Sequence, residues 1–390
     1  MINIKNKKIP ISKFILFASH ANSVLNFRQN FINDLNRQSL DVHIVIPKLC
    51  SVNDKGIISK IERLGVTVHE VDLNRTGLNP FLDFITLLRI IIIFRKVKPE
   101  YILSYTIKPV IYGSFAARLL GIKHCFALIT GLGHVFNEGA SVKHKVLLFV
   151  VKYLYKIGLS GTEKVFFQNP DDSRLFCSLK IINVEKSCVV NGSGVDLNYY
   201  KFFISPKNKE VSFLMLARLL NSKGVRIYFE AAKNIKALYP DICFFLAGNV
   251  DDLNNDSISK VELDSWVKSG VIDYYGSLKD VRSAIVNCSV YVLPSFYREG
   301  TPRSILEAMS TGRAIITTDT PGCRETVVNG KNGYLIAPKS VPDLVNSMFK
   351  FVKNPNIISD MGIKSREIAE EKYDVKKVNL KMLRTMKIVK

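Results

Sequence analysis

The chain has 390 residues, of which 47% are hydrophobic, and its 55 lysines and arginines against 34 acidic residues give a formal net charge of +21. This length exceeds what one hydrophobic core usually supports, so we expect two domains, and the apolar content excludes a disordered chain. The positive charge is spread over both halves and is typical of proteins that meet nucleic acid, anionic lipid or phosphorylated ligands.

The seven cysteines are scattered along the chain, without a C-x-x-C pair. An odd number of cysteines in apolar runs indicates reduced thiols packed as small hydrophobic residues. We therefore expect neither a disulfide framework nor a zinc site.

Short apolar runs alternate with longer amphipathic ones in the first half of the chain. Helical patterns occur, for example, at 26–38 and at 109–121, where a glycine ends the run. Strand–helix alternation predicts a parallel sheet with helices on both faces. Strands are expected at 14–18, 42–47, 66–71, 101–105, 125–130 and 165–168.

Two predicted helices of this half are unusually apolar, LLRIIIIFRKVK (87–98) and KHKVLLFVVKYLYK (143–156). The simpler interpretation is that each one covers the sheet. Two apolar helices that also carry lysine and arginine favour a second interpretation, contact with an anionic membrane surface. No stretch reaches the roughly 20 apolar residues that a membrane-spanning helix needs. The apolar run in MINIKNKKIPISKFILFAS is short and predicts a first strand, not a secretory leader.

The alternation is interrupted at 191–210, which is rich in Gly, Asn, Ser and Pro and is interpreted as a linker. It then restarts, so a second doubly wound domain is expected. We predict an N-terminal domain at 1–200, a C-terminal domain at 201–370 and a helix at 371–390 that packs back on the N-terminal domain. Further strands are expected at 211–217, 242–248, 271–276, 290–295, 314–318 and 334–338.

Residues 298–312, REGTPRSILEAMSTG, follow a predicted strand and lead into a helix. Thr301 is expected to cap this helix, with proline at its first position. Free amides at a helix N-terminus, here those of Gly300 and Thr301, attract a phosphate. Glu299 and Glu307 would repel a phosphate but suit neutral vicinal hydroxyls, such as those of a ribose.

The positive charge for a diphosphate is expected from ARLLNSKG (217–224), where Arg218 and Lys223 follow a strand at the same sheet edge. No D-x-D pair and no cluster of histidine and aspartate occurs, and DDLNND (251–256) is interpreted as a solvated loop. We therefore expect no metal and no cofactor.

Several segments together resemble family 4 of the retaining glycosyltransferases. They are ARLLNSKG, EGTPRSILEA, GRAIITTDTPGCRETVVNGKNGYLI (312–336) and the linker NGSGVD; FASHANSVLNFRQNF, SYTIKPVIYGSFAARLLGI and ITGLGHVF are similar to a narrower group that acts on polyprenyl-diphosphate-linked glycans. The resemblance covers roughly the first 370 residues. It implies a GT-B fold, two Rossmann-like α/β domains facing a central cleft.

The resemblance also implies which residues act. Arg218 and Lys223 would bind the donor diphosphate and stabilise its departure, Glu307 would bind the ribose, and Glu299 would bind sugar hydroxyls beside the anomeric carbon. Gly300 and Thr301 would contact the phosphate or the sugar. Weaker candidates for acceptor or cleft residues are Ser19, His20, Asn22 and Arg28 around a loop after the first strand, and Gly131, Gly133 and His134, of which His134 is interpreted as a loop histidine.

The predicted reaction is a metal-independent transfer with retention of configuration, from a UDP-sugar to a lipid-diphosphate-linked saccharide. From the same resemblance, UDP-GalNAc and an α linkage are the first choice, with UDP-GlcNAc and UDP-Gal as alternatives, for O-antigen, capsule or glycoprotein synthesis. The enzyme would lie in the cytoplasm, peripherally on the inner face of a bacterial plasma membrane.

Three other functions were weighed. Gly131 and Gly133 could suggest a dinucleotide-binding motif, but position 136 is Phe and no acidic residue follows at the required distance, so a dehydrogenase is rejected. A sugar-nucleotide 2-epimerase on the same scaffold would need further acidic residues in the first domain. A basic nucleic-acid-binding protein would need aromatic residues within a basic stripe, whereas the charge here is diffuse.

Overall fold

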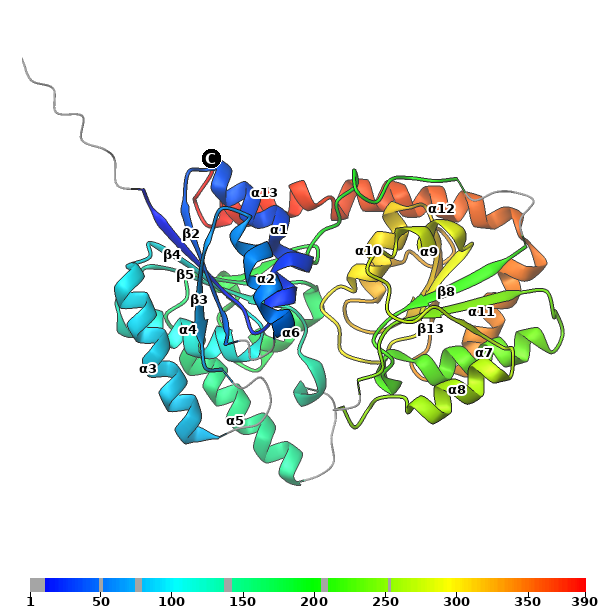
Figure 1. The fold of residues 1–390 in the computed structure, drawn as a ribbon, viewed down its shortest axis with the longest axis horizontal. Helices are drawn as coiled ribbons and strands as arrows, with labels where there is room; N and C mark the ends of the chain where they lie inside the picture. Colours follow the sequence, from blue (N-terminus) through cyan, green and yellow to red (C-terminus); the bar gives the residue numbers. More distant parts are fainter. Residues whose placement is uncertain (1–10, 49–51, 74–78, 137–141, 205–209, 252–253) are drawn as a thin grey trace, which may run out of the picture.

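The computed structural model describes residues 11–48, 52–73, 79–136, 142–204, 210–251 and 254–390. Two parallel sheets, each sandwiched between helices, lie side by side in Figure 1, one in each half of the chain. The predicted α/β architecture of two Rossmann-like domains is therefore confirmed.

The first sheet has the strand order β3-β2-β1-β4-β5-β6-β7, and its strands pair in parallel. Its strands are β1 (Lys13–Phe17), β2 (Asp41–Pro47), β3 (Thr67–Val71), β4 (Tyr101–Tyr105), β5 (His124–Ile129), β6 (Lys164–Phe167) and β7 (Ser187–Val189). The edge strand β7 was not predicted, because three residues are too few to show a period.

Successive residues of β1 face opposite layers, which explains why the strand is apolar throughout. Phe14 and Leu16 pack under α1 (Ala21–Arg37) and α2 (Val52–Glu62), whereas Ile15 and Phe17 pack under α3 (Pro80–Val97) and α4 (Ile107–Leu119). A strand covered on both faces needs apolar side chains in both directions. The remaining helices of this half are η1 (Gly133–Phe136), α5 (Val142–Leu159), α6 (Pro170–Ser178) and η2 (Val184–Lys186).

Helix α1 begins earlier than predicted. His20 caps it, because its Nδ1 accepts a hydrogen bond from the amide of Asn22 at 3.1 Å. The prediction of a polar loop through Ser23 is therefore wrong, since Asn22 and Ser23 already lie in the first helical turn. A side-chain cap gives a partner to one of the free amides of the first turn and lets the helix start directly after the strand.

The second sheet has the order β10-β9-β8-β11-β12-β13, also parallel. Its strands are β8 (Ser212–Leu216), β9 (Cys243–Ala247), β10 (Asp273–Tyr274), β11 (Val290–Leu293), β12 (Ala314–Thr318) and β13 (Gly333–Ile336). The helices around it are η3 (Asn221–Lys223), α7 (Val225–Lys236), α8 (Lys260–Lys268), α9 (Arg282–Asn287), α10 (Arg303–Ser310), η4 (Arg324–Thr326), α11 (Val341–Lys353) and α12 (Asn356–Ile368).

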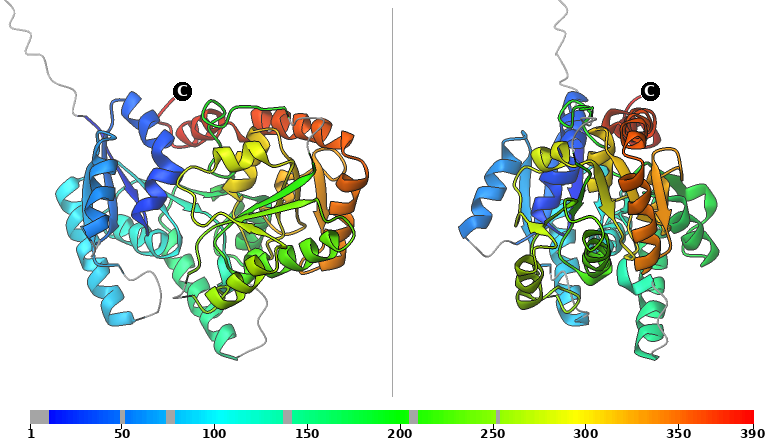
Figure 2. Two further views of the ribbon diagram at one scale, coloured as in Figure 1. Left: turned by 45° about the vertical axis from the view of Figure 1, so that its right-hand side comes forward. Right: turned by 90° about the vertical axis from the view of Figure 1, so that its right-hand side faces the viewer.

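The chain ends by returning to the first half. After α12 and the π-helical turn η5 (Ala369–Tyr373), helix α13 (Val375–Thr385) runs beside α1, as Figures 1 and 2 show. Its apolar residues Val378, Met382 and Leu383 belong to the same buried cluster as Phe14 and Leu16 of β1. The last helix thus joins the two halves through a hydrophobic contact, which closes one side of the space between them.

Candidate active site

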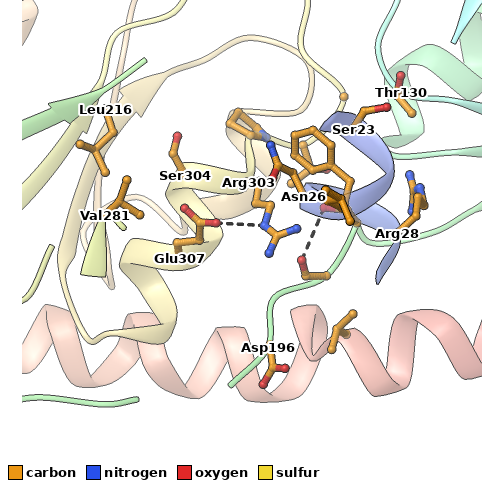
Figure 3. Close-up of a pocket in the computed structure, with 18 of the residues that line it drawn as sticks. Ser23, Asn26, Arg28, Thr130, Asp196, Leu216, Val281, Arg303, Ser304 and Glu307 are labelled. Atoms are coloured by element: carbon orange, nitrogen blue, oxygen red, sulfur yellow. Dashed lines mark hydrogen bonds and ion pairs between the residues drawn. The ribbon is translucent and has the colours of Figure 1, made fainter. Parts of the chain in front are cut away.

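A cleft of about 790 Å³ lies between the two halves and is lined by residues of both. The first half contributes α1 and the ends of β4 and β5, and the second half contributes the loop after β8 and the segment 299–307. Figure 3 shows part of this lining, with Arg303, Ser304 and Glu307 of α10 facing Ser23 and Arg28 of α1. The carboxyl ends of parallel strands from both sheets therefore meet at one cavity, where such folds bind ligands.

The loop that carries Glu299 is held by the first half of the chain. Arg298 donates from Nε to the carboxylate of Asp172 at 2.9 Å, and the Asp172 side chain is only 1% exposed. The side-chain amide of Asn169 donates from Nδ2 to the backbone carbonyl of Gly300 at 3.0 Å. Burial raises the pKa of Asp172, while Arg298 beside it acts in the opposite direction. A charged pair and a backbone contact thus fix the loop against α6.

The start of α10 differs from its prediction. Pro302 is the residue before the helix, and it offers no side-chain cap. The hydroxyl of Thr301 instead donates to the carbonyl of Gln168 at 2.8 Å, across the domain boundary. The predicted cap by threonine, with proline at the first helical position, is therefore wrong. Gly300 and Thr301 still line the cleft.

Two glycines allow the halves to approach closely. A Cβ at Gly131 would lie 2.6 Å from the amide nitrogen of Gly300, and one at Gly300 would lie 2.6 Å from the carbonyl oxygen of Thr130. Gly131 also has a φ of +112°, which side-chain-bearing residues rarely adopt. Gly131 thus forms part of the contact between the halves and does not line the cleft.

Glu299 and Lys223 form an ion pair inside the cleft. Ser295 donates a hydrogen bond to the same carboxylate oxygen, Oε1, at 3.0 Å. Within the described part of the chain no donor contacts Oε2 of Glu299. The Lys223 ammonium also lies 5.1 Å from the centre of the Tyr297 ring. One carboxylate oxygen is therefore fixed, and the other is free for a ligand.

Glu307 repeats this arrangement one helical turn into α10. Tyr200 and Arg303 both donate to its Oε1, at 2.8 and 2.9 Å. Among the described residues no donor contacts its Oε2. Burial raises the pKa of Glu307, and the nearby Arg303 lowers it again in part. Tyr200 and Arg303 were not predicted as site residues, and only the pairing with Glu307 reveals them.

Arg218 lies at the mouth of the cleft, with its side chain 54% exposed, and its guanidinium is 3.5 Å from the carboxylate of Asp251. Asp256 accepts a hydrogen bond from the amide of Ser222 at 3.0 Å. The segment 251–256 was interpreted as a solvated loop, but these two aspartates hold the arginine and the turn before Lys223.

The weaker candidates of the first half divide into two groups. Arg28 lines the cleft, whereas Ser19, His20 and Asn22 do not. Ser19 accepts a hydrogen bond from the cleft residue Thr106 at 2.7 Å, and so supports the lining from behind. Gly133, which does not line the cleft, packs against Tyr297: a Cβ there would lie 2.7 Å from the Tyr297 hydroxyl. His134 lies in η1, and its side chain is outside the described part of the structure.

The described residues contain no group of three or more His, Cys, Asp or Glu placed to hold a metal ion. Among the described residues the cleft is instead lined by four acidic residues (Asp196, Asp280, Glu299 and Glu307) and five basic ones (Arg28, Arg218, Lys223, Lys279 and Arg303). This arrangement can bind a ligand that carries both phosphates and hydroxyl groups.

Sequence models of two protein families match the chain. Residues 200–368 match the family described as "Glycosyl transferases group 1", and residues 14–169 match "Glycosyl transferase 4-like". The chain is a GT-B glycosyltransferase. Of the hypotheses that the sequence left open, the family matches select this one over the epimerase and the nucleic-acid-binding protein.

Two curated glycosyltransferases are similar to most of this chain. An N,N'-diacetylbacillosaminyl-diphospho-undecaprenol alpha-1,3-N-acetylgalactosaminyltransferase of Campylobacter jejuni is 29% identical over 341 residues, which are 84% of this chain and 86% of the relative. A UDP-Gal:alpha-D-GlcNAc-diphosphoundecaprenol alpha-1,3-galactosyltransferase of Escherichia coli is 26% identical over 280 residues, 69% of this chain and 70% of the relative.

Solved structures share the fold at lower identity. The structure of Anabaena Alr3699/HepE in complex with UDP and glucose has a TM-score of 0.77 and 17% identity, and the match covers 97% of this chain and 100% of that one. A sucrose-phosphate synthase from Thermosynechococcus elongatus has a TM-score of 0.75 at 16% identity, covering 96% and 98%. Both matches extend over the two domains together.

Proposed function

We propose that this glycosyltransferase moves an N-acetylhexosamine or hexose from a UDP-sugar onto an undecaprenyl-diphosphate-linked glycan, with retention of configuration and without a metal ion. The observation that carries the proposal is the pairing of Lys223 with Glu299 in a cleft that also contains Arg218 and Glu307. The choice of a UDP donor and a lipid-linked acceptor is supported by the names of curated relatives and of a structural neighbour, which are at most 29% identical to this chain.

The basic residues of the second half would bind the donor diphosphate. Lysine has three N–H donors, so Lys223 can keep its bond to Glu299 and donate to a phosphate oxygen at the same time. The Arg218 side chain is 54% exposed, so it has room to turn from Asp251 toward the phosphates. Both charges stabilise the negative charge that develops on the leaving diphosphate.

The two carboxylates would bind hydroxyl groups through their free oxygens. Oε2 of Glu307 would accept from the ribose, and Oε2 of Glu299 from the sugar beside its anomeric carbon. Each carboxylate is already oriented by two donors on Oε1, so little conformational freedom is lost when the ligand binds. This orientation distinguishes the pair from solvated surface glutamates.

The proposed chemical step occurs on one face of the sugar. The bond between the anomeric carbon and the diphosphate oxygen breaks, and its electrons pass to that oxygen. The acceptor hydroxyl forms a bond to the same carbon from the same side, and its proton passes to the departing oxygen. Because the departing oxygen takes this proton, no separate base is needed. Lys223 and Arg218 stabilise the negative charge on that oxygen while it leaves.

A lipid-linked acceptor requires access to a membrane, and the surface of α3 and α5 offers one. Both helices pack against α4, and their amino-terminal ends point downward in Figure 1. No helix among the described residues is long and apolar enough to cross a bilayer. Large exposed apolar side chains are Phe81, Phe84, Leu88 and Ile92 on α3 and Val142, Val146, Phe149 and Tyr153 on α5.

Exposed lysines at 143, 145 and 156 accompany the apolar residues of α5. A helix with apolar side chains and lysines on its exposed surface binds at the interface of an anionic bilayer. We therefore assign the enzyme to the cytoplasmic face of a bacterial plasma membrane, attached peripherally through these two helices.

The test is a transfer assay with the purified full-length protein, synthetic polyprenyl-diphosphate-linked GlcNAc or bacillosamine, and a panel of UDP- and GDP-sugars. UDP-GalNAc is expected to be the best donor, and nuclear magnetic resonance of the product should show an α anomeric proton. Transfer from GDP-sugars alone would contradict the donor assignment. A β product would contradict retention, and conversion of the sugar nucleotide without acceptor would favour an epimerase.

A further inference from the structure

Arg28 occupies an unusual position for a charged residue. Helix α1 buries Val24, Phe31, Ile32 and Leu35 against the first sheet, and Arg28 falls on the same face at the same helical spacing. Its side chain is only 2% exposed. An apolar residue would satisfy the packing at this position, so the presence of arginine calls for a different explanation.

Among the described residues the guanidinium of Arg28 has no counter-ion. Within the described part of the chain it makes no hydrogen bond or ion pair, and its buried Nε has no acceptor. Its charge lies 5.3 Å from the centre of the Tyr105 ring, a weak interaction compared with a carboxylate. Burial, together with a smaller contribution from Arg303 across the cleft, lowers the pKa of Arg28 to about 10. Removing a charge from water without a partner costs several kcal/mol.

Nearby acidic groups are already committed to other partners. Asp196 accepts from Asn30 at 3.2 Å, and Glu307 is paired with Arg303. Hydroxyl groups of the first half line the same cleft as Arg28. Ser23 is hydrogen-bonded to Tyr105 at 2.8 Å, and Thr106 and Thr130 also line the cavity.

The cleft gives a partner access to Arg28, because Arg28 lines it. Arg28, Ser23 and Thr130 lie together on one side of Figure 3, and Arg303 and Ser304 lie on the other. An anion between them would meet two guanidinium groups, one from each half, and several hydroxyl donors. Arginine binds phosphate oxygens in a forked geometry, which a buried and rigid guanidinium presents without loss of freedom.

We propose that Arg28 is a phosphate-binding residue of the cleft, which pairs with a diphosphate group carried in by a substrate. The inference rests on the proposed function for the source of that group. It is either the diphosphate of the nucleotide donor or that of the polyprenyl carrier on the acceptor. In both cases Arg28 adds a cation from the first half to those of Arg218 and Lys223 in the second.

The experiment measures binding directly, by calorimetry with UDP and with farnesyl diphosphate as separate probes. Arg28→Met preserves the length and the apolar stem, Arg28→Lys keeps a charge without the fork, and Arg37→Met is the matched control on the same helix, since Arg37 is 75% exposed. Arg28→Met is expected to weaken the affinity for one of the two probes by about tenfold or more. Arg28→Lys should weaken it less, and Arg37→Met should leave it unchanged.

The two probes identify the source. A loss confined to UDP assigns the donor diphosphate, and a loss confined to farnesyl diphosphate assigns the carrier. Unchanged affinity for both overturns the proposal. The measurement does not require catalysis, so a chain that transferred no sugar but lost diphosphate affinity would refute the proposed function and leave this inference standing.

Thermal unfolding without ligand separates binding from a structural role. Because Arg28→Met removes an unpaired buried charge, the variant should melt a few degrees higher than the wild type. Its melting temperature should also rise less when the affected probe is added. A variant that melts lower and binds both probes weakly would show that Arg28 supports the fold, and would contradict the proposal.

Discussion

The two halves of the cleft differ in how their charges are balanced. In the second half Glu299 pairs with Lys223, Glu307 with Arg303 and Arg218 with Asp251. In the first half Arg28 is buried with no partner among the described residues, and large apolar side chains of α3 and α5 face solvent. The charges named in the second half are thus paired before a ligand binds. The first half has a buried charge without a counter-ion and an exposed apolar surface.

This difference agrees with a division of labour between the domains. A site whose charges pair with one another keeps its geometry before the substrate arrives, which suits a small and constant ligand such as a nucleotide sugar. A site with an unpaired buried charge gains stability when an anionic ligand binds, and the apolar surface of α3 and α5 in the same half suits a ligand attached to lipid. The predictions below test each half of this contrast, starting with the largest effect.

Removal of the Lys223 charge should have the largest effect. Lys223→Met takes away the cation proposed to stabilise the leaving diphosphate, so kcat should fall by about 100- to 1,000-fold, with the circular dichroism spectrum unchanged. Glu299→Gln should impair transfer comparably. Arg226→Met is the matched control, because Arg226 and Glu262 form an exposed ion pair at 2.7 Å in the same domain. A Lys223→Met enzyme with full activity would show that the second half does not bind the diphosphate as described.

Breaking the contact between the halves should reduce stability. Arg298→Met leaves the buried carboxylate of Asp172 without its cation and with only the hydrogen bond from Asn169, and the free energy of unfolding should fall by about 3 kcal/mol. Adding Asp172→Asn to this variant should restore part of the loss, since the buried charge is then gone. Urea denaturation measures both. If the double variant is no more stable than Arg298→Met, the loss does not come from the unpaired carboxylate.

A negative charge introduced on α5 should weaken membrane binding. Phe149 is 69% exposed, and Phe149→Glu places a negative charge in the proposed contact with anionic lipid. Co-sedimentation with phosphatidylglycerol vesicles should drop several-fold, and wild-type binding should weaken as salt rises. Val261→Glu is the control, because Val261 is 80% exposed on α8 of the other half. Equal losses from both variants would place the membrane contact elsewhere.

The smallest predicted effect is a pH dependence from Glu307. Burial raises the pKa of this carboxyl in the folded protein above its ordinary value of 4.5. As pH rises through 4.5 the unfolded chain releases the proton first, so ionisation favours unfolding until the pH passes the folded-state pKa. The wild type should therefore lose stability relative to Glu307→Gln across that window. A difference in stability that is constant with pH would contradict the assignment.

Much of the fold could be predicted from the sequence because its signals are local. Buried parallel strands are continuous apolar runs, so the expected strand at 125–130 lies within one residue of β5. Edge strand β7, with three residues, shows no such signal. The early start of α1 depends on the His20 ring accepting from the amide of Asn22, a geometry that a residue pattern does not specify.

The sequence predicted those site residues that lie within one recognisable segment of the chain, but not the contacts between segments. Glu299, Glu307, Lys223 and Arg218 each lie in a strand–turn–helix motif, and they line one cleft in the structure. Contacts between segments far apart in sequence left no signal. The role of Thr301 was mistaken for this reason, because its hydroxyl partner, the carbonyl of Gln168, lies in the other half.

The most direct test of the account is a crystal structure of the full-length protein with intact UDP-GalNAc bound. The account predicts the diphosphate within hydrogen-bond distance of Lys223 and Arg218, the ribose hydroxyls on Oε2 of Glu307, and the sugar on Oε2 of Glu299. A nucleotide sugar bound outside this cleft, or one whose phosphates contact neither basic side chain, would contradict it.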